Sequence, residues 1–230
     1  MRNTLPSFDR RRQLDTRRAD PVYRVDAGFD TDQSTSLPLE AATQSASLHA
    51  QIAQTSVRSR TLAVAGLVIG ALLGMAGSFA PSAEFRGLAW TVDGVALVVA
   101  SALLAIHHLR QGNEQLAAGF LVFLVGETLI VSGSAMELAA SAPTFAAGAG
   151  LWSAALALVS ASPVMPAFVR LTGAIAAILL AVTTARIALG SGLTPLSEPL
   201  PFFAYPFLAL TLFGWAWVHR DRHRTDVANL

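Results

Sequence analysis

The basic residues of this chain lie almost entirely near its two ends. Nine of the 16 basic residues precede residue 61 and three follow residue 219, so the long region between them carries only four. Of the 230 residues, 53% are hydrophobic and only 13% are charged. A soluble domain typically carries about 25% charged residues. A long region nearly free of charge therefore indicates a polytopic membrane domain with polar ends.

This region contains six apolar segments separated by short polar breaks. They are predicted at residues 61–80, 87–108, 119–139, 144–160, 167–189 and 202–218. A helix of about 20 residues crosses the roughly 30 Å of hydrocarbon in a bilayer. The predicted fold class is therefore all-α, a polytopic membrane protein built as a six-transmembrane-helix bundle over residues 58–219.

The segments that flank this bundle are polar. Residues 1–57 are predicted to form a cytoplasmic, mostly disordered arm, in which the composition of residues 38–57 favours an interfacial helix. Residues 220–230 are predicted to form a basic cytoplasmic tail.

The arginines also predict how the bundle is oriented. If the N-terminus is cytoplasmic, seven arginines lie at inner helix ends and only Arg86 and Arg186 lie at outer ends, which agrees with the positive-inside rule. Every basic residue is arginine, a codon bias that suggests a GC-rich bacterial genome. The predicted localisation is therefore the bacterial inner membrane, multi-pass, with both termini cytoplasmic.

One carboxylate lies near the middle of the third apolar segment. An acidic side chain at a helix centre opposes insertion by about 2.5 to 3.5 kcal/mol, so Glu127 must face protein or water. Glu137 follows about 15 Å further along the axis and roughly 80° around it, on the same side of the predicted helix. The side of the helix that carries both acids is therefore expected to face the polar interior.

Four polar groups, Glu137 among them, are predicted to share one outer layer. Counting along each segment places Asp93, Glu137, Arg186 and Tyr205 near the outer end of the bundle, above Glu127. They predict an outward-facing polar cavity, with Arg186 paired to Asp93 or Glu137 and Glu127 at the floor. A midplane carboxylic acid that binds and releases a proton is what proton-coupled transport requires.

The same groups have a structural interpretation. Intramembrane acids and arginines can pair simply to hold helix register, and Arg186 or Glu137 can extend to the headgroups from an outer end. Glu127 has no such escape at the midplane, so its position favours a functional role more strongly.

Glycines recur on two of the predicted helices. They repeat every fourth residue at Gly66, Gly70 and Gly74, and every seventh residue at Gly119, Gly126 and Gly133. Small residues at such spacing let two helix backbones approach closely in lipid. The partner of the first stripe is expected within the same chain, with a homodimer as the alternative.

Other chemistries find little support. The chain has no cysteine and lacks the common phosphate-binding and metalloprotease motifs, and acids near its basic arm argue against nucleic acid. His107 and His108 adjoin Arg110 at an inner helix end, whereas transmembrane haem ligation normally uses histidines within spans. No metal or cofactor is therefore predicted.

The predicted function is a small permease-like or proton-linked transport protein rather than an enzyme, with lipid and an unknown small molecule as partners. Its halves show no convincing internal repeat, which weakens the transport prediction. A non-catalytic accessory protein with structural buried charges is the alternative, and a haem- or quinone-associated membrane subunit is the third possibility.

Overall fold

The computed structural model describes the backbone of residues 36–228 and, continuously, the side chains of residues 57–220. The chain divides into two units, residues 1–46 and residues 47–230. The described part of the first unit, residues 36–46, is helical. Most of the predicted polar arm lies outside the described residues, and the arrangement below is that of the second unit.

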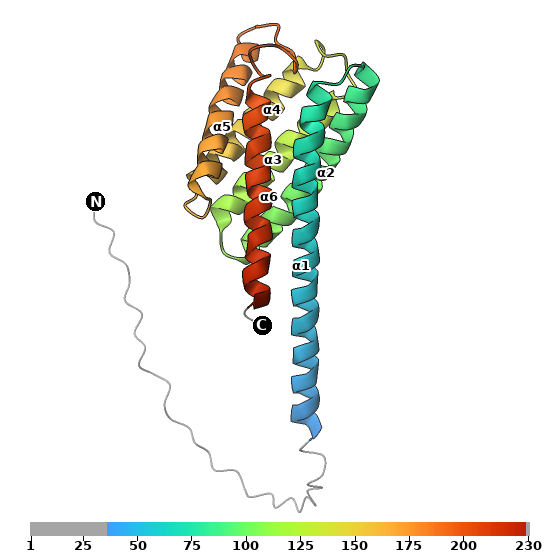
Figure 1. Cartoon of the computed structure of the whole chain (residues 1–230), viewed down its shortest axis with the longest axis vertical. Helices are drawn as coiled ribbons and strands as arrows, with labels where there is room; N and C mark the ends of the chain where they lie inside the picture. The colour runs from blue at the N-terminus through green and yellow to red at the C-terminus, as the bar shows by residue number, and fades with distance from the viewer. Residues whose placement is uncertain (1–35, 229–230) are drawn as a thin grey trace, which may run out of the picture. The chain divides into compact units, whose positions relative to one another are not determined.

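The described backbone forms six helices and, between residues 36 and 228, no strand. They are α1 (Ser36–Ser78), α2 (Ala83–Arg110), α3 (Glu114–Gly133), α4 (Ala142–Ala161), α5 (Ala167–Ala188) and α6 (Ala204–Ala228), as Figure 1 shows. Five of them are long and apolar enough to cross a membrane, in α1 over Val57–Ser78. The predicted helical membrane bundle is therefore confirmed, with the 25-residue α6 as its sixth helix.

The outer surface of the bundle is apolar. Leu62 of α1 and Leu171 and Ile178 of α5 are 61%, 63% and 64% exposed. Soluble proteins rarely expose large apolar side chains over contiguous areas, because burying them yields roughly 25 cal/mol per Å². These side chains are suited to contact with lipid tails.

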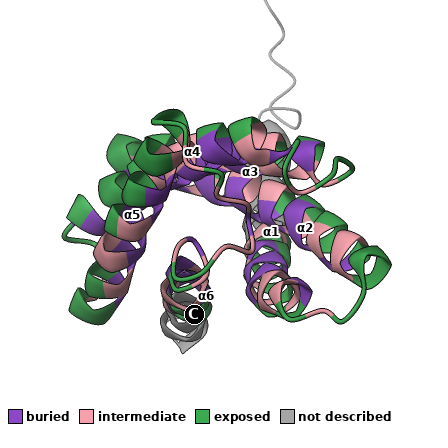
Figure 2. Cartoon of the chain, turned by 90° about the horizontal axis from the view of Figure 1, so that it is seen from above, coloured by how far each residue is buried: buried purple, intermediate pink, exposed green. Residues whose placement is uncertain are grey.

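Helices α2 to α5 follow one another in a curved row, and α6 lies on its concave side (Figure 2). Each helix of the row packs against the next, and α5 packs against α6. Buried residues gather on the helix sides that face neighbouring helices (Figure 2). The concave side is therefore where polar side chains can be withdrawn from lipid.

Both glycine stripes are used for packing within the chain. A Cβ built at Gly66 would lie 2.7 Å from the Ala96 carbonyl oxygen of α2, and one at Gly126 would lie 2.9 Å from the Gly148 carbonyl oxygen of α4. Side chains essentially never approach backbone this closely. The first stripe thus seats α1 on α2, and the second seats α3 on α4.

Helix α3 ends earlier than the predicted segment 119–139. Its last helical residue is Gly133, after which the Ser134 hydroxyl donates to the Val131 carbonyl at 2.7 Å and the Met136 amide donates to the Gly133 carbonyl at 3.0 Å. These bonds satisfy the last carbonyls of the helix and turn the chain. Glu137 therefore lies in the α3–α4 loop, and the prediction that it sits on the third helix was wrong.

Candidate functional site

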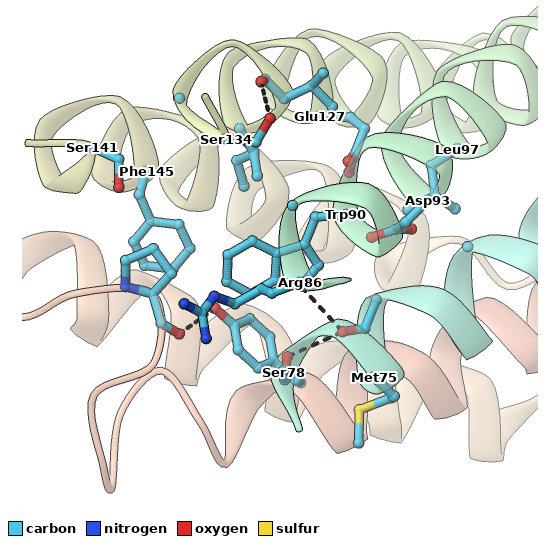
Figure 3. A pocket seen from close by; sticks show the side chains of 18 of the residues that line it. Met75, Ser78, Arg86, Trp90, Asp93, Leu97, Glu127, Ser134, Ser141 and Phe145 are labelled. Carbon is cyan, nitrogen blue, oxygen red and sulfur yellow. Dashed lines mark hydrogen bonds between the residues drawn. The ribbon is translucent and has the colours of Figure 1, made fainter. Parts of the chain in front are cut away.

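A cavity of about 530 Å³ opens at one end of the bundle. This end, called the loop end below, is where α1 meets α2 and where the α3–α4 loop (134–141) and the α5–α6 loop (189–203) lie. The volume falls within the range of roughly 300 to 1,000 Å³ that is usual for small-molecule sites. Figure 3 shows side chains from several helices converging on this space.

Asp93 reaches the cavity from α2, and glycines of α1 make room for it. Its side chain is 8% exposed, and a Cβ built at Gly74 would lie 2.9 Å from Asp93 Oδ2. The same construction at Gly70 would lie 3.1 Å from Oδ1, an oxygen that has no hydrogen-bond partner. The carboxyl group therefore rests against bare helix backbone.

Glu127 reaches the same cavity from α3. It is only 1% exposed, and its Oε2 atom has no hydrogen-bond partner. Its Oε1 atom faces α2, where a Cβ built at Gly94 would lie 3.1 Å away. The Trp152 indole of α4 lines the same cavity, and its Nε1 atom makes no hydrogen bond.

The two carboxyl groups are electrostatic neighbours. Both line the cavity, and Glu127 Oε1 lies beside Gly94, the residue that follows Asp93. Two desolvated acids side by side repel each other when both are ionised, and each unpaired charge costs several kcal/mol to bury. The pair is therefore suited to holding a proton or a cation.

Tyr205 and Arg86 also contribute polar groups to the lining of the cavity. The Tyr205 hydroxyl donates a hydrogen bond of 2.6 Å to the Pro195 carbonyl, which ties α6 to the preceding loop. The Arg86 guanidinium lies 6.0 Å from the centre of the Trp90 ring, in cation–π geometry. The Trp90 indole in turn donates to the Gly74 carbonyl at 3.4 Å (Figure 3).

Four of the five predicted site residues line this one cavity, and the fifth does not. Asp93, Glu127, Glu137 and Tyr205 are among the lining residues, with Glu137 exposed at the loop end. Arg186 is exposed near the end of α5 and is not part of the lining. The expected pairing of Arg186 with an acid inside a vestibule is therefore not what the structure shows, because depth along a helix does not determine the side that a residue faces.

Reasoning from the sequence missed three contributors to the lining. Arg86 is the arginine that the structure brings to the cavity, while Trp90 and Trp152 supply aromatic walls. Neither tryptophan was among the residues predicted to line the cavity. Only a comparison of helix faces would have aligned these residues with Asp93.

A second polar cluster lies on the other side of the core. His108 of α2 and His219 of α6 are 0% and 1% exposed, and their Nε2 atoms are 3.1 Å apart. The His219 Nδ1 atom lies 2.6 Å from the Trp215 carbonyl. In the described part of the chain, no group of three or more His, Asp and Glu side chains is arranged to hold a metal ion.

Aromatic side chains fill the space between the cavity and the histidines. Phe123 stacks on Trp152 with ring centres 5.8 Å apart and meets Trp215 edge-on at 5.6 Å. Phe120 meets Trp215 at 5.0 Å and stacks on His108 at 5.5 Å. Phe120, Phe123 and Trp215 are fully buried, and Trp152 belongs to the lining of the cavity, so this aromatic layer runs from the cavity wall to His108.

Comparison with known proteins adds no relative. No protein-family model matches the chain, and neither the curated proteins nor the solved structures yield a match. What the cavity does must therefore be inferred from its own side chains.

Proposed function

We propose that this chain is a small permease-like, proton-linked transport protein in which Asp93 and Glu127 release and take up protons as a ligand enters and leaves the cavity. The observation that carries the proposal is the placement of two buried carboxyl groups, each with one oxygen that makes no hydrogen bond, on the same cavity. The proposed location is the bacterial inner membrane, with both termini cytoplasmic and the loop end outward.

The surroundings of the two acids favour this proposal over a purely structural role. A buried acid that only holds helix register is normally matched by a cation or by several donors, because breaking such a match costs about 3 to 5 kcal/mol. Here Asp93 rests on Gly70 and Gly74, and Arg186 is exposed elsewhere. The carboxyl oxygens are left available to a proton or a ligand.

The aromatic layer beside the cavity also fits a transport cycle. Phe120, Phe123 and Trp215 lie between Trp152 of the cavity wall and the buried His108. A protein that moves a solute must keep one side closed while the other is open. In this proposal the structure represents the state that is open at the loop end.

The proposal can be tested by following carboxyl protonation in lipid. Infrared difference spectra of the full chain in lipid bilayers should show a protonated carboxyl C=O band that disappears as the pH rises, and Glu127→Gln should remove it. Glu84→Gln provides the matched control, because it replaces the same carboxyl group by an amide at an exposed position outside the cavity lining.

Two outcomes would contradict the proposal. One is a titrating band that is identical in the wild type and in Glu127→Gln. The other is a loss of folded Glu127→Gln protein from the membrane while Asp93→Asn shows no change in carboxyl titration, which would identify the acids as structural locks.

A further inference from the structure

We propose that the ligand of this cavity is an organic cation with an apolar body, which binds beside Asp93 and Glu127 and releases a proton from that pair. The inference rests on the proposed function and adds the chemical class of the ligand. In the exchange, the cation enters as a carboxylic acid loses its proton to water, so the charge of the occupied site stays the same.

The charges that line the cavity select for a positive ligand. Among the described residues, three acids contribute to the lining, Asp93, Glu127 and Glu137, against the one basic side chain of Arg86. Arg86 is engaged with the Trp90 ring. An anionic ligand would meet an excess of negative charge beside the buried acids, whereas a cation would offset it.

The elements around the acid pair bring few other titratable groups to it. Helix α1 faces it with Gly70 and Gly74, α4 with Trp152, and α6 with the Tyr205 ring, whose hydroxyl is bonded to the Pro195 carbonyl. Proton exchange in the cavity is therefore assigned to the carboxyl pair.

Aromatic walls specify an organic cation over a hydrated metal ion. Trp90, Trp152 and Phe145 line the space with faces or edges that can contact a cation's apolar groups. A hard ion such as Ca²⁺ takes six to eight oxygen ligands. Within residues 57–220 no cluster of three metal-binding side chains occurs, and a cavity of about 530 Å³ is large for a bare ion.

Two probes of the same shape and opposite charge test the inference. Binding of tetraphenylphosphonium and of tetraphenylborate to the purified full chain in lipid nanodiscs is measured by equilibrium dialysis, with empty nanodiscs subtracted. Saturable binding of the phosphonium and none of the borate is expected. Because cation and proton compete, the apparent Kd of the phosphonium should rise as pH falls, by up to about tenfold per pH unit for one exchanged proton.

Substitutions on the two sides of the cavity should act in opposite directions. Asp93→Asn and Glu127→Gln should each weaken phosphonium binding at least about tenfold, since each removes the charge that offsets the ligand. Arg86→Gln should strengthen it, because the one lining cation is lost. Arg186→Gln, at an exposed position outside the lining, should leave the Kd unchanged.

Proton release provides a measurement that needs no variant. Adding the phosphonium to wild-type protein in weak buffer should release about one proton per bound cation, detected with a pH-sensitive dye. Equal binding of the borate, or phosphonium binding that is indifferent to pH and to both carboxyl substitutions, would overturn the inference.

This outcome is separable from failure of the proposed function. If the Glu127 band titrates in lipid but the phosphonium does not bind, the assignment of an organic cation fails alone. If neither carboxyl group titrates, proton linkage itself fails.

Discussion

The Nε2 atoms of His108 and His219 are 3.1 Å apart, which joins α2 to α6 across 111 residues of sequence. The Trp215 carbonyl can only accept, so the His219 Nδ1 atom that lies 2.6 Å from it carries the hydrogen. In the neutral pair, His219 Nε2 is therefore the acceptor and His108 Nε2 is the donor. This bond joins α2 and α6 on the side of the core that lies opposite the cavity.

This pair predicts strong coupling between two substitutions. His108→Phe and His219→Phe should each lower the free energy of unfolding by about 1 to 3 kcal/mol, because each leaves one ring without this hydrogen bond in a buried site. The double variant should lose less than the sum, since two apolar rings replace the bonded pair. Reversible unfolding in mixed micelles, followed by tryptophan fluorescence, measures the cycle. Strictly additive losses would show that the bond contributes no coupling energy.

Because the Asp93 carboxyl group packs against Gly74 of α1, adding one methyl group at Gly74 should lower the free energy of unfolding. Gly74→Ala would place a Cβ 2.9 Å from Asp93 Oδ2, so helix or carboxyl must shift at a cost of about 1 to 3 kcal/mol. Gly87→Ala is the matched control, because a Cβ built there has no atom within 4 Å. It should be neutral or stabilise by about 0.5 to 1 kcal/mol through helix propensity. Similar unfolding free energies for the two variants would contradict the described packing of α1 on α2.

The aromatic layer of Phe120, Phe123 and Trp215 predicts that one truncation will lower stability and let protons leak through the bundle. Phe123→Ala should lower the free energy of unfolding by about 3 to 5 kcal/mol and leave a void between the cavity and Trp215. In liposomes with a trapped pH dye, passive proton leakage should increase. Leu121→Ala, on the same helix but 46% exposed, should do neither. Unchanged proton leakage through Phe123→Ala would mean that another part of the chain blocks the passage of protons.

The Tyr205 hydroxyl predicts a modest local effect. Tyr205→Phe removes the donor of the 2.6 Å bond to the Pro195 carbonyl, which should cost about 0.5 to 1.5 kcal/mol. Because the bond ties α6 to the α5–α6 loop beside the cavity, hydrogen exchange of that loop should accelerate while exchange in α4 stays the same. Unchanged exchange in the loop would show that the bond does not hold it.

The positions of the helices could be predicted from the sequence because membrane thickness demands long apolar runs with polar breaks. The end of α3 could not, since no proline stops it and its termination depends on local bonds of Ser134 and Met136. Counting along each segment also grouped Asp93 with Tyr205, and both residues line the one cavity.

The direction in which each side chain points could not be predicted in the same way. Arg86 and Arg186 were both placed at outer helix ends, yet only Arg86 lines the cavity. The orientation of a nearly uniform apolar helix depends on the partner against which it packs. The His108–His219 contact was missed for a related reason, because the sixth predicted segment ended at residue 218, whereas α6 continues to Ala228.

Gly66, Gly70 and Gly74 occupy equivalent places on successive turns of α1, and Ser78 follows at the same interval. A slide of α1 by four residues, about 6 Å along its axis, would bring either Leu62 to the place of Gly66 or Ser78 to the place of Gly74. At the first place a Cβ meets the Ala96 carbonyl oxygen at 2.7 Å, and at the second it meets Asp93 Oδ2 at 2.9 Å. The stripe is therefore just long enough to hold α1 in one register on α2, and that register sets the position of the Asp93 carboxyl group.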